Sequence, residues 1–256
     1  MNSAGGTWSQ QAPPIRIVPL RGAPPPRTGA PAAAHLTYRG GPLLTAAEAT
    51  LLFWGPAWTE AANARTAERI TEFHRFVLGS EYIGQLAEYG VPGQAIGRGH
   101  IAEATTIADR SPPVSLTDSA IQQLLLAELG RQSLPAATSN SLYVVFSPPG
   151  VTVSAGRDRS CQTFCGYHDR TADGSVFYAV VPYPGCTGCL AGLAVPDAFT
   201  SVCSHELAEA ITDPVPGTGW YDDANGEIGD ICAWQNRRFA GYEVQRLWSN
   251  QAAACV

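Results

Sequence analysis

The pattern of hydrophobic and polar positions predicts ordered elements from about residue 43 onward. The stretch "ATLLFWG" (49–55) is a short apolar run bounded by turn residues, which is typical of a buried strand. The stretch 59–90 then carries apolar residues at helical spacing and ends at a glycine, so it predicts one or two helices. The residues on that helical face are Ile70, Phe73, Phe76 and Val77.

A second helix is predicted to begin after Thr117 or Asp118, because both are favourable N-cap residues. Its apolar face is formed by Ile121, Leu124, Leu125 and Leu129. The stretches 142–154 ("LYVVFSPPGVTVS") and 175–183 ("SVFYAVVPY") have the composition of strands. Strands and helices in this order predict a single α+β domain with a mixed sheet packed on helices.

The first 42 residues differ from the rest of the chain. They are rich in proline, glycine and alanine, and they show neither the helical nor the strand period of apolar residues. We therefore expect residues 1–42 to be a disordered leader or pro-segment, and residues 43–256 to be the folded domain.

Charge and composition narrow the classes of partner. The formal net charge is −6 and there is no run of lysine or arginine, so neither nucleic acid nor an anionic membrane surface is an expected partner. No apolar stretch approaches the ~20 residues that cross a bilayer. The chain has one methionine, 20 prolines and closely spaced cysteines, which favours a secreted, extracellular protein with disulfides, although no signal peptide is visible in this numbering. We expect a monomer.

The seven cysteines fall into three groups. Cys161, Cys165, Cys186 and Cys189 have the spacing of a zinc ribbon, but in an exported chain disulfides are favoured, and the spacing leaves their connectivity open. Cys232 and Cys255 are predicted to form a bridge. Cys203 remains, and we expect it to pack as a small buried hydrophobic residue.

The stretch "SHELAEAITDP" (204–214) carries the chemistry. A helix is predicted from about Asp197, as N-cap, to Asp213, because Pro214 cannot continue it. His205 and Glu209 are four residues apart, so they share one helix face and can bind one ion. This resembles the His-Glu-x-x-His motif of zinc peptidases with a glutamate in the second ligand position, and it predicts a zincin-like domain.

The stretch "GWYDDANGEIGDIC" (219–232) supplies further carboxylates. Glu227 follows Glu209 by 18 residues (227 − 209 = 18), a placement similar to that of the third ligand in thermolysin-like peptidases. Asp230 is predicted to accept a hydrogen bond from the ring of the ligand His205, outside the metal's own ligand set. The predicted metal ligands are therefore His205, Glu209 and Glu227.

These residues predict a metal-dependent peptidase. Bound zinc lowers the pKa of its water toward ~7, and Glu206 is the expected general base that removes a proton from it. A donor for the developing oxyanion is also needed, and the candidates are Tyr221, His168, Tyr242 and Arg237. The substrate is expected to be an extended peptide or protein segment, paired with an edge strand such as "SVFYAVV" (175–181).

Alternatives follow from the same residues. Asp222, Asp223 and Asn225 have the composition of a turn, and they are also suitable calcium ligands. A non-enzymatic extracellular protein in which the ion only holds the two stretches together is a second hypothesis. A third is a cluster without an ion, which would leave several carboxylates in mutual repulsion with raised pKa values.

Six segments together resemble the phosphate-induced protein or Exordium-like family of plants and its bacterial relatives. They are "LLFWGPAW", "CGYHD", "YPGCTGC", "SHELAEAITDP", "GWYDDANGEIGDIC" and "LWSNQAAAC", and they span about residues 43–256. Plant members are secreted, cell-wall-associated proteins linked to growth responses, so the resemblance implies export. The resemblance carries no biochemical activity over to this chain.

Overall fold

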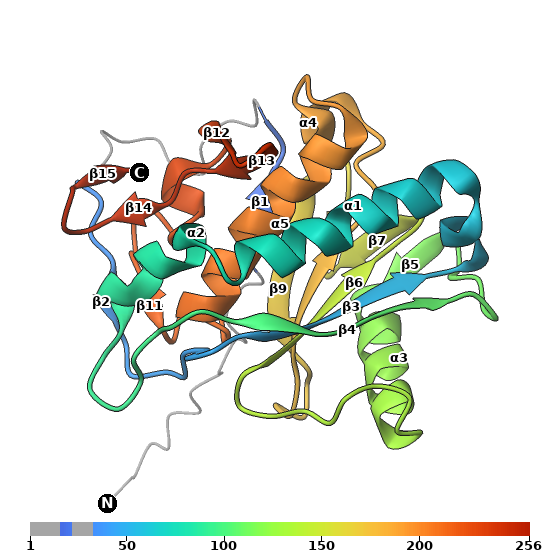
Figure 1. Cartoon of the computed structure of the whole chain (residues 1–256), viewed down its shortest axis with the longest axis horizontal. Helices are drawn as coiled ribbons and strands as arrows, with labels where there is room; N and C mark the ends of the chain where they lie inside the picture. The colour runs from blue at the N-terminus through green and yellow to red at the C-terminus, as the bar shows by residue number, and fades with distance from the viewer. Residues whose placement is uncertain (1–15, 22–32) are drawn as a thin grey trace, which may run out of the picture.

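A six-stranded mixed sheet forms the centre of the protein in a computed structural model that describes residues 16–21 and 33–256 (Figure 1). Four neighbouring strands, β10, β6, β3 and β4, run parallel, whereas β9 is antiparallel to β10 and β1 is antiparallel to β9. In sheet order the strands are β1 (Arg16–Pro19), β9 (Phe164–Arg170), β10 (Phe177–Val181), β6 (Ser141–Phe146), β3 (Glu48–Trp54) and β4 (His100–Ile107).

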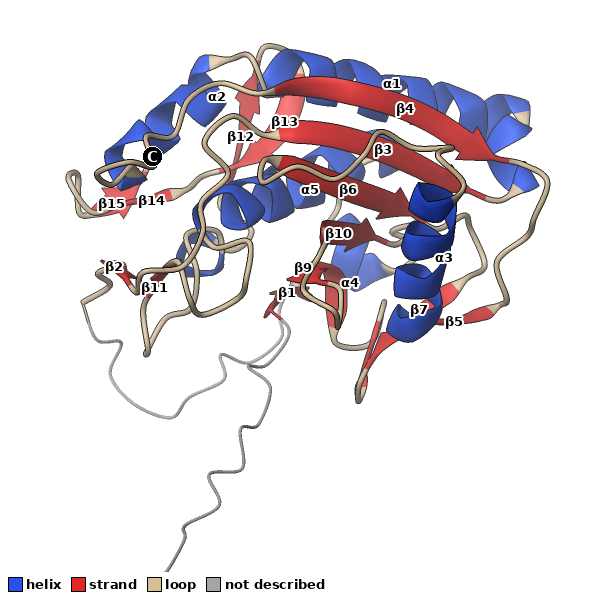
Figure 2. Cartoon of the chain, turned by 90° about the horizontal axis from the view of Figure 1, so that it is seen from below, coloured by secondary structure: helices blue, strands red, loops and turns tan. Residues whose placement is uncertain are grey.

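Helices cover both faces of this sheet (Figure 2). On one face lie α1 (Ala61–Val77) and α5 (Val195–Thr212), and on the other lies α3 (Asp118–Gly130). Strand β3 divides its apolar side chains between the two faces: Leu51 packs in the core under α1 and α5, and Leu52 packs in the core under α3. Alternation of this kind is expected of a strand that is buried on both sides.

Short elements complete the fold around the sheet. The remaining helices are η1 (Pro56–Thr59), α2 (Glu81–Gly84), η2 (Gln85–Tyr89), α4 (Thr187–Leu190) and η3 (Asp230–Cys232). The remaining strands are β2 (Thr37–Tyr38), β5 (Ser115–Thr117), β7 (Thr152–Ala155), β8 (Asp158–Arg159), β11 (Trp220–Tyr221), β12 (Asn236–Phe239), β13 (Tyr242–Gln245), β14 (Trp248–Ser249) and β15 (Ala254–Cys255).

The α+β prediction is confirmed, and so are its main elements. The buried strand near 49–55 is β3, and the second predicted helix is α3, whose N-cap is Thr117 with its side chain accepting from the backbone of Ala120. Among the described helices, none is both long and apolar enough to cross a membrane.

Two predictions about the sheet need correction. The disorder predicted for the first 42 residues is wrong for β1 and β2, because each gains backbone partners from distant strands, β9 and β11. Residues 1–15 and 22–32 of that predicted leader lie outside the described residues. The stretch 175–181 is also no edge, because β10 has β9 on one side and β6 on the other.

Three disulfides join the cysteines as pairs. Cys232–Cys255 is the predicted bridge, and the other four cysteines form the disulfides Cys161–Cys186 and Cys165–Cys189 rather than a zinc ribbon. Cys203 is free and buried, as expected. Disulfides persist in oxidising compartments, so the cysteine pattern fits a secreted protein.

Candidate metal centre

Helix α5 carries the His-Glu-x-x-Glu motif. Pro196 lies in its first turn, where the missing N–H has no helical partner to lose, and Asp213, which precedes a proline, is its C-cap. The helix begins slightly earlier than predicted, with Ala194 as N-cap. The predicted N-cap, Asp197, lies inside the first turn, where a carboxylate interacts favourably with the helix N-terminus.

Beyond its first three residues, α5 has no exposed face. Every residue from Ala198 to Thr212 is buried, including His205, Glu206 and Glu209. Polar side chains on such a helix need partners inside the protein, because an unpaired buried polar group costs about 1–3 kcal/mol and a charged group more.

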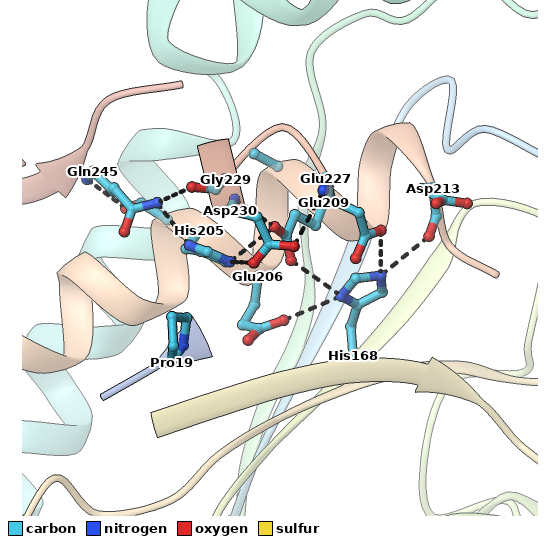
Figure 3. A network of polar contacts seen from close by, with 12 residues as sticks. Pro19, His168, His205, Glu206, Glu209, Asp213, Glu227, Gly229, Asp230 and Gln245 are labelled. Atoms are coloured by element: carbon cyan, nitrogen blue, oxygen red, sulfur yellow. Dashed lines mark hydrogen bonds and ion pairs between the residues drawn. The ribbon is translucent and has the colours of Figure 1, made fainter. Parts of the chain in front are cut away.

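At one end of the cluster, the ring of His205 faces two carboxylates (Figure 3). Its Nε2 lies 2.8 Å from Glu209 Oε1 and 3.9 Å from Asp230 Oδ1. On the other side of the ring, Gln245 Nε2 lies 2.6 Å from Nδ1 and also donates to the carbonyl of Gly229 at 2.9 Å. Gln245 therefore holds the ring so that Nε2 is the nitrogen turned toward the carboxylates.

At the other end of the cluster, the ring of His168 in β9 lies close to Glu209, the glutamate that also faces His205. Its Nδ1 lies 3.2 Å from Glu206 Oε2 and 3.6 Å from Glu209 Oε2. Its Nε2 lies 3.1 Å from the carbonyl oxygen of Asp213, and since a carbonyl only accepts, this nitrogen carries a proton. Sequence spacing did not link His168 to α5, because the contact depends on which strand lies beside the helix.

Glu227 takes a different place from the one predicted. Its Oε1 lies 3.4 Å from Nε2 of His168, and its backbone N–H donates to Asp230 Oδ2 at 3.1 Å. Beside His205 and Glu209 it is Asp230 that brings a carboxylate within reach, and the backbone N–H of Asp230 also donates to Glu209 Oε1 at 3.1 Å.

Within this cluster, two groups of three residues can therefore hold an ion, and both include Glu209. The first is His205, Glu209 and Asp230, and the second is His168, Glu206 and Glu209. In each group, one potential ligand atom from every residue lies within 4.8 Å of the others. Glu209 turns one oxygen to each group, as the distances of Oε1 and Oε2 to the two histidines show.

Several buried atoms of this cluster lack a hydrogen-bond partner. They are Nε2 of His205, Oε1 of Glu206, Oε2 of Glu209 and both carboxylate oxygens of Glu227. His205 Nε2 and Glu209 Oε1 are close, but they are not aligned as a hydrogen bond. A hydrogen bond therefore does not account for this close approach.

Burial and neighbouring charges together set the pKa values of the cluster. Burial raises the pKa of Glu206, and it raises that of Glu227 well above its usual range. Burial lowers the pKa of His168, but the carboxylates of Glu227 and Glu206 act more strongly together and hold it well above its usual range. Burial also opposes ionisation of Glu209, but both histidines outweigh it and lower its pKa. The cluster therefore attracts positive charge.

Two glycines let the backbone approach the cluster closely. A Cβ at Gly166 of β9 would lie 2.7 Å from Val202 Cγ1 and 2.9 Å from Glu206 Oε1. A Cβ at Gly229 would lie 2.8 Å from His205 Nδ1 and 2.9 Å from Glu209 Oε1. Side chains at these positions would displace the glutamates and His205.

The other predicted oxyanion donors have contacts of their own. Tyr221 lies in β11, with the guanidinium of Arg39 4.4 Å from its ring centre. Tyr242 is buried and packs against Phe73, with ring centres 5.2 Å apart. The guanidinium of Arg237 lies over the ring of Phe239. His168, the fourth candidate, contacts Glu206.

The calcium alternative involves Asp222, Asp223 and Asn225, and the carboxylate oxygens of Asp222 have backbone donors. Oδ1 accepts from the N–H groups of Ala224 and Asn225, both at 2.8 Å, and Oδ2 accepts from that of His35 at 2.8 Å. This arrangement favours the turn interpretation of the stretch.

No family model matches the chain. The chain is similar to Protein EXORDIUM-like 5 of Arabidopsis thaliana, with 28% identity over 149 residues. The matched part is 46% of this chain and 39% of that protein, so the chain spans about two fifths of the relative's length. This partial similarity supports a relationship to the Exordium-like family.

Proposed function

We propose that this protein is a secreted, metal-dependent peptidase that uses zinc to hydrolyse peptide bonds. The observation that carries the proposal is the set of buried nitrogen and oxygen atoms around Glu209 that have no hydrogen-bond partner. Natural proteins rarely leave such atoms unpaired. A divalent cation beside His205 would take its Nε2 as a ligand, and one beside His168 would take Oε1 of Glu206 or Oε2 of Glu209.

The ligands proposed for this ion are His205 and Glu209. The third ligand is a carboxylate: Asp230 is the one that lies near both residues, and Glu227 is the one predicted from the sequence. The Asp230 side chain is 18% exposed, which gives this group a side open to solvent. A bound zinc ion supplies an acidic water and polarises the substrate carbonyl. One nitrogen with two carboxylates also suits manganese or iron.

Glu206 is the proposed general base. It takes a proton from the attacking water as the water oxygen bonds to the peptide carbonyl carbon, and it delivers that proton to the amine nitrogen when the carbon–nitrogen bond breaks. Its Oε1 lacks a partner, and its Oε2 is held by His168 at 3.2 Å. Its raised pKa, caused by burial, makes it a stronger base than an exposed glutamate.

A structural ion is a second candidate function, and two observations favour it. The second group of ligands, His168, Glu206 and Glu209, is wholly buried, as in closed structural metal sites. His168 also donates from Nε2 to a backbone carbonyl, the common outer partner of a metal-bound histidine, whereas His205 has the amide nitrogen of Gln245 at the corresponding position.

The variant Glu206→Gln separates the two functions. For a peptidase, the variant retains one equivalent of zinc by plasma mass spectrometry, and its turnover of a peptide library falls by about 10²–10⁴-fold. For a structural ion the variant loses the metal, because Glu206 is then a ligand. Glu68→Gln, an exposed glutamate on α1, is the control and retains both properties.

Protein without stoichiometric metal, purified without chelator or nickel affinity resin, would contradict both functions. Metal that survives both His205→Ala and His168→Ala would place the ion outside this cluster.

Two further assignments belong to the proposal. Three disulfides support secretion. The His-Glu-x-x-Glu helix beside a mixed sheet supports the assignment to a zincin-like member of the bacterial Exordium-like relatives. The proposal also includes Tyr221 and His168 as residues that assist the reaction.

A further inference from the structure

The strand β1 completes the central sheet from a part of the chain far from β9 in sequence. It has four residues, and it comes from the proline-, glycine- and alanine-rich N-terminal region (Figure 1). It lies at one end of the sheet, so β9 would become the edge strand if β1 were absent.

Hydrogen bonds of the backbone hold much of β1 in place. Arg16, Ile17 and Val18 pair in antiparallel register with His168, Tyr167 and Gly166 of β9. The register shifts after Val18, and the carbonyl of Pro19 then accepts a hydrogen bond from the indole of Trp234 at 2.8 Å. Main-chain pairing of this kind is how extended peptides bind to exposed sheet edges.

The segment continues with contacts to the disulfide-linked region. The N–H of Arg21 donates to the carbonyl of Gly188 at 3.1 Å, and its guanidinium donates to the carbonyl of Ala191 at 2.6 Å. Leu20 packs so closely on Gly188 that a Cβ there would lie 2.8 Å from Leu20 Cδ2. Residues 16–19 are therefore held by β9, and residues 20 and 21 by the region around α4.

One side chain of β1 anchors it in the interior. Val18 is 1% exposed and packs in the core cluster that also contains Cys165 and Val202. Pro19 follows at the register shift. A proline is tolerated in an edge strand because its missing N–H removes no inner ladder bond.

The segment also lies over the candidate site. Val18 is paired with Gly166, the glycine whose missing side chain makes room for Glu206 Oε1. Figure 3 shows Pro19 on the side of α5 from which Glu206 projects. Val18 is therefore paired with the residue of β9 that faces the proposed general base.

We propose that β9 is a peptide-binding edge and that residues 16–21 occupy it within the same chain. When residues 16–21 leave, an extended substrate peptide binds the same edge in antiparallel orientation. The occupant has a buried aliphatic side chain at the position of Val18 and an outward carbonyl for Trp234. That the bound peptide is also cleaved rests on the proposed peptidase function. The peptide-binding edge does not.

The test uses the full chain with a recognition sequence for a site-specific protease placed between residues 22 and 32. After cleavage, a fluorescent synthetic peptide of residues 13–22 ("PPIRIVPLRG") is added, and binding is followed by fluorescence anisotropy with zinc and with chelator. A peptide with Val18→Asp is the matched control, because it keeps the backbone and places a charge in the buried position.

We expect the cleaved protein to bind one peptide after its own N-terminal piece has been exchanged. The uncut chain should bind about 100-fold more weakly, since its own segment acts at a high effective concentration. The Val18→Asp peptide should bind at least about tenfold more weakly than the native one. The Trp234→Phe protein should bind the native peptide more weakly, because the donor to Pro19 is missing.

Equal binding of the two peptides, or no binding by a cleaved chain that keeps its circular dichroism and melting temperature, would overturn the proposal. So would unfolding on release of the piece, because β1 would then be an integral strand. If the metal-loaded protein binds the peptide but hydrolyses no peptide, the binding edge is supported and the proposed peptidase function is contradicted. If it hydrolyses a substrate and the peptide does not compete, the peptidase function is supported and the binding edge is contradicted.

Discussion

Two buried histidines of this protein differ in charge because their neighbours differ. His74 of α1 is 1% exposed, its Nδ1 lies 2.8 Å from the carbonyl of Ile70, and aromatic rings surround it, among them Phe73 and Phe146. Burial lowers its pKa to about 4. His205 of α5 is equally inaccessible, but Glu209, Glu206 and Asp230 outweigh the effect of burial and raise its pKa to about 9.

The comparison teaches that burial alone does not identify a functional histidine. At His74 the backbone partner and the apolar surroundings suit a neutral ring, and nothing further is needed. Around His205 several carboxylates are buried together, and five of the cluster's nitrogen and oxygen atoms have no hydrogen-bond partner. The unpaired atoms of the second environment are the observation on which the proposed cation rests.

The largest effect on stability is expected from Glu209→Gln, measured as the loss of stabilisation by zinc. This variant makes the surroundings of His205 more like those of His74. Both candidate ligand groups include Glu209, so the variant should lose the ion whichever group holds it. Zinc at a thousand times its Kd should stabilise the native chain by about 4 kcal/mol and the variant by almost nothing. Urea unfolding with zinc and with chelator measures this difference.

Glu68→Gln on the exposed face of α1 is the control and should respond to zinc as the native chain does. A Glu209→Gln protein with an undiminished zinc response would show that the ion, if one binds, lies elsewhere.

A smaller effect is expected from pH acting on His74. Its pKa of about 4 in the folded state is below the ordinary 6.5, so the unfolded state gains the proton first as pH falls. The stability contribution is therefore complete above pH 6.5 and is lost progressively toward pH 4, by about 3 kcal/mol in total.

The measurement is the free energy of unfolding at pH 7 and pH 4.5, in chelator, for the native chain and for His74→Gln. The variant should lose less stability on acidification, because Gln does not titrate. An identical loss in both proteins would mean that His74 is not neutral in the folded state.

The smallest effect is expected at an exposed carboxylate. Asp223 pairs with Arg39 at 2.7 Å, but its side chain is 91% exposed, so solvent screens the interaction. Asp223→Asn should change the free energy of unfolding by no more than about 0.5 kcal/mol and should leave any metal response intact. A loss of the metal response would instead support a calcium site in the turn at 222–225.

The sequence predicted the local features of the fold well. The strand β3, the Thr117 cap of α3 and the course of α5 all follow from periodicity and capping. The Cys232–Cys255 bridge was also predicted. These features depend on residues close in sequence or, for the bridge, on the few cysteines available.

Features that depend on sheet order were not predictable in this way. His168 reaches α5 because β9 lies beside it, and β1 is ordered because β9 offers it backbone partners. The third carboxylate near His205 is Asp230 rather than Glu227, since the loop before η3 sets their positions. The pairing of Cys161 with Cys186 and of Cys165 with Cys189 likewise depends on how α4 packs on β9.

The two glycines beside the cluster give a way to recognise this arrangement in other chains. Gly166 is two residues before His168, and Gly229 directly precedes Asp230. A useful search pattern is therefore Gly-x-His in a strand, His-Glu-x-x-Glu in the following long helix, and Glu-x-Gly-Asp in the loop after it. A chain that keeps the helix motif but has larger residues at either glycine cannot pack its glutamates in the same way, and it should not be grouped with this one.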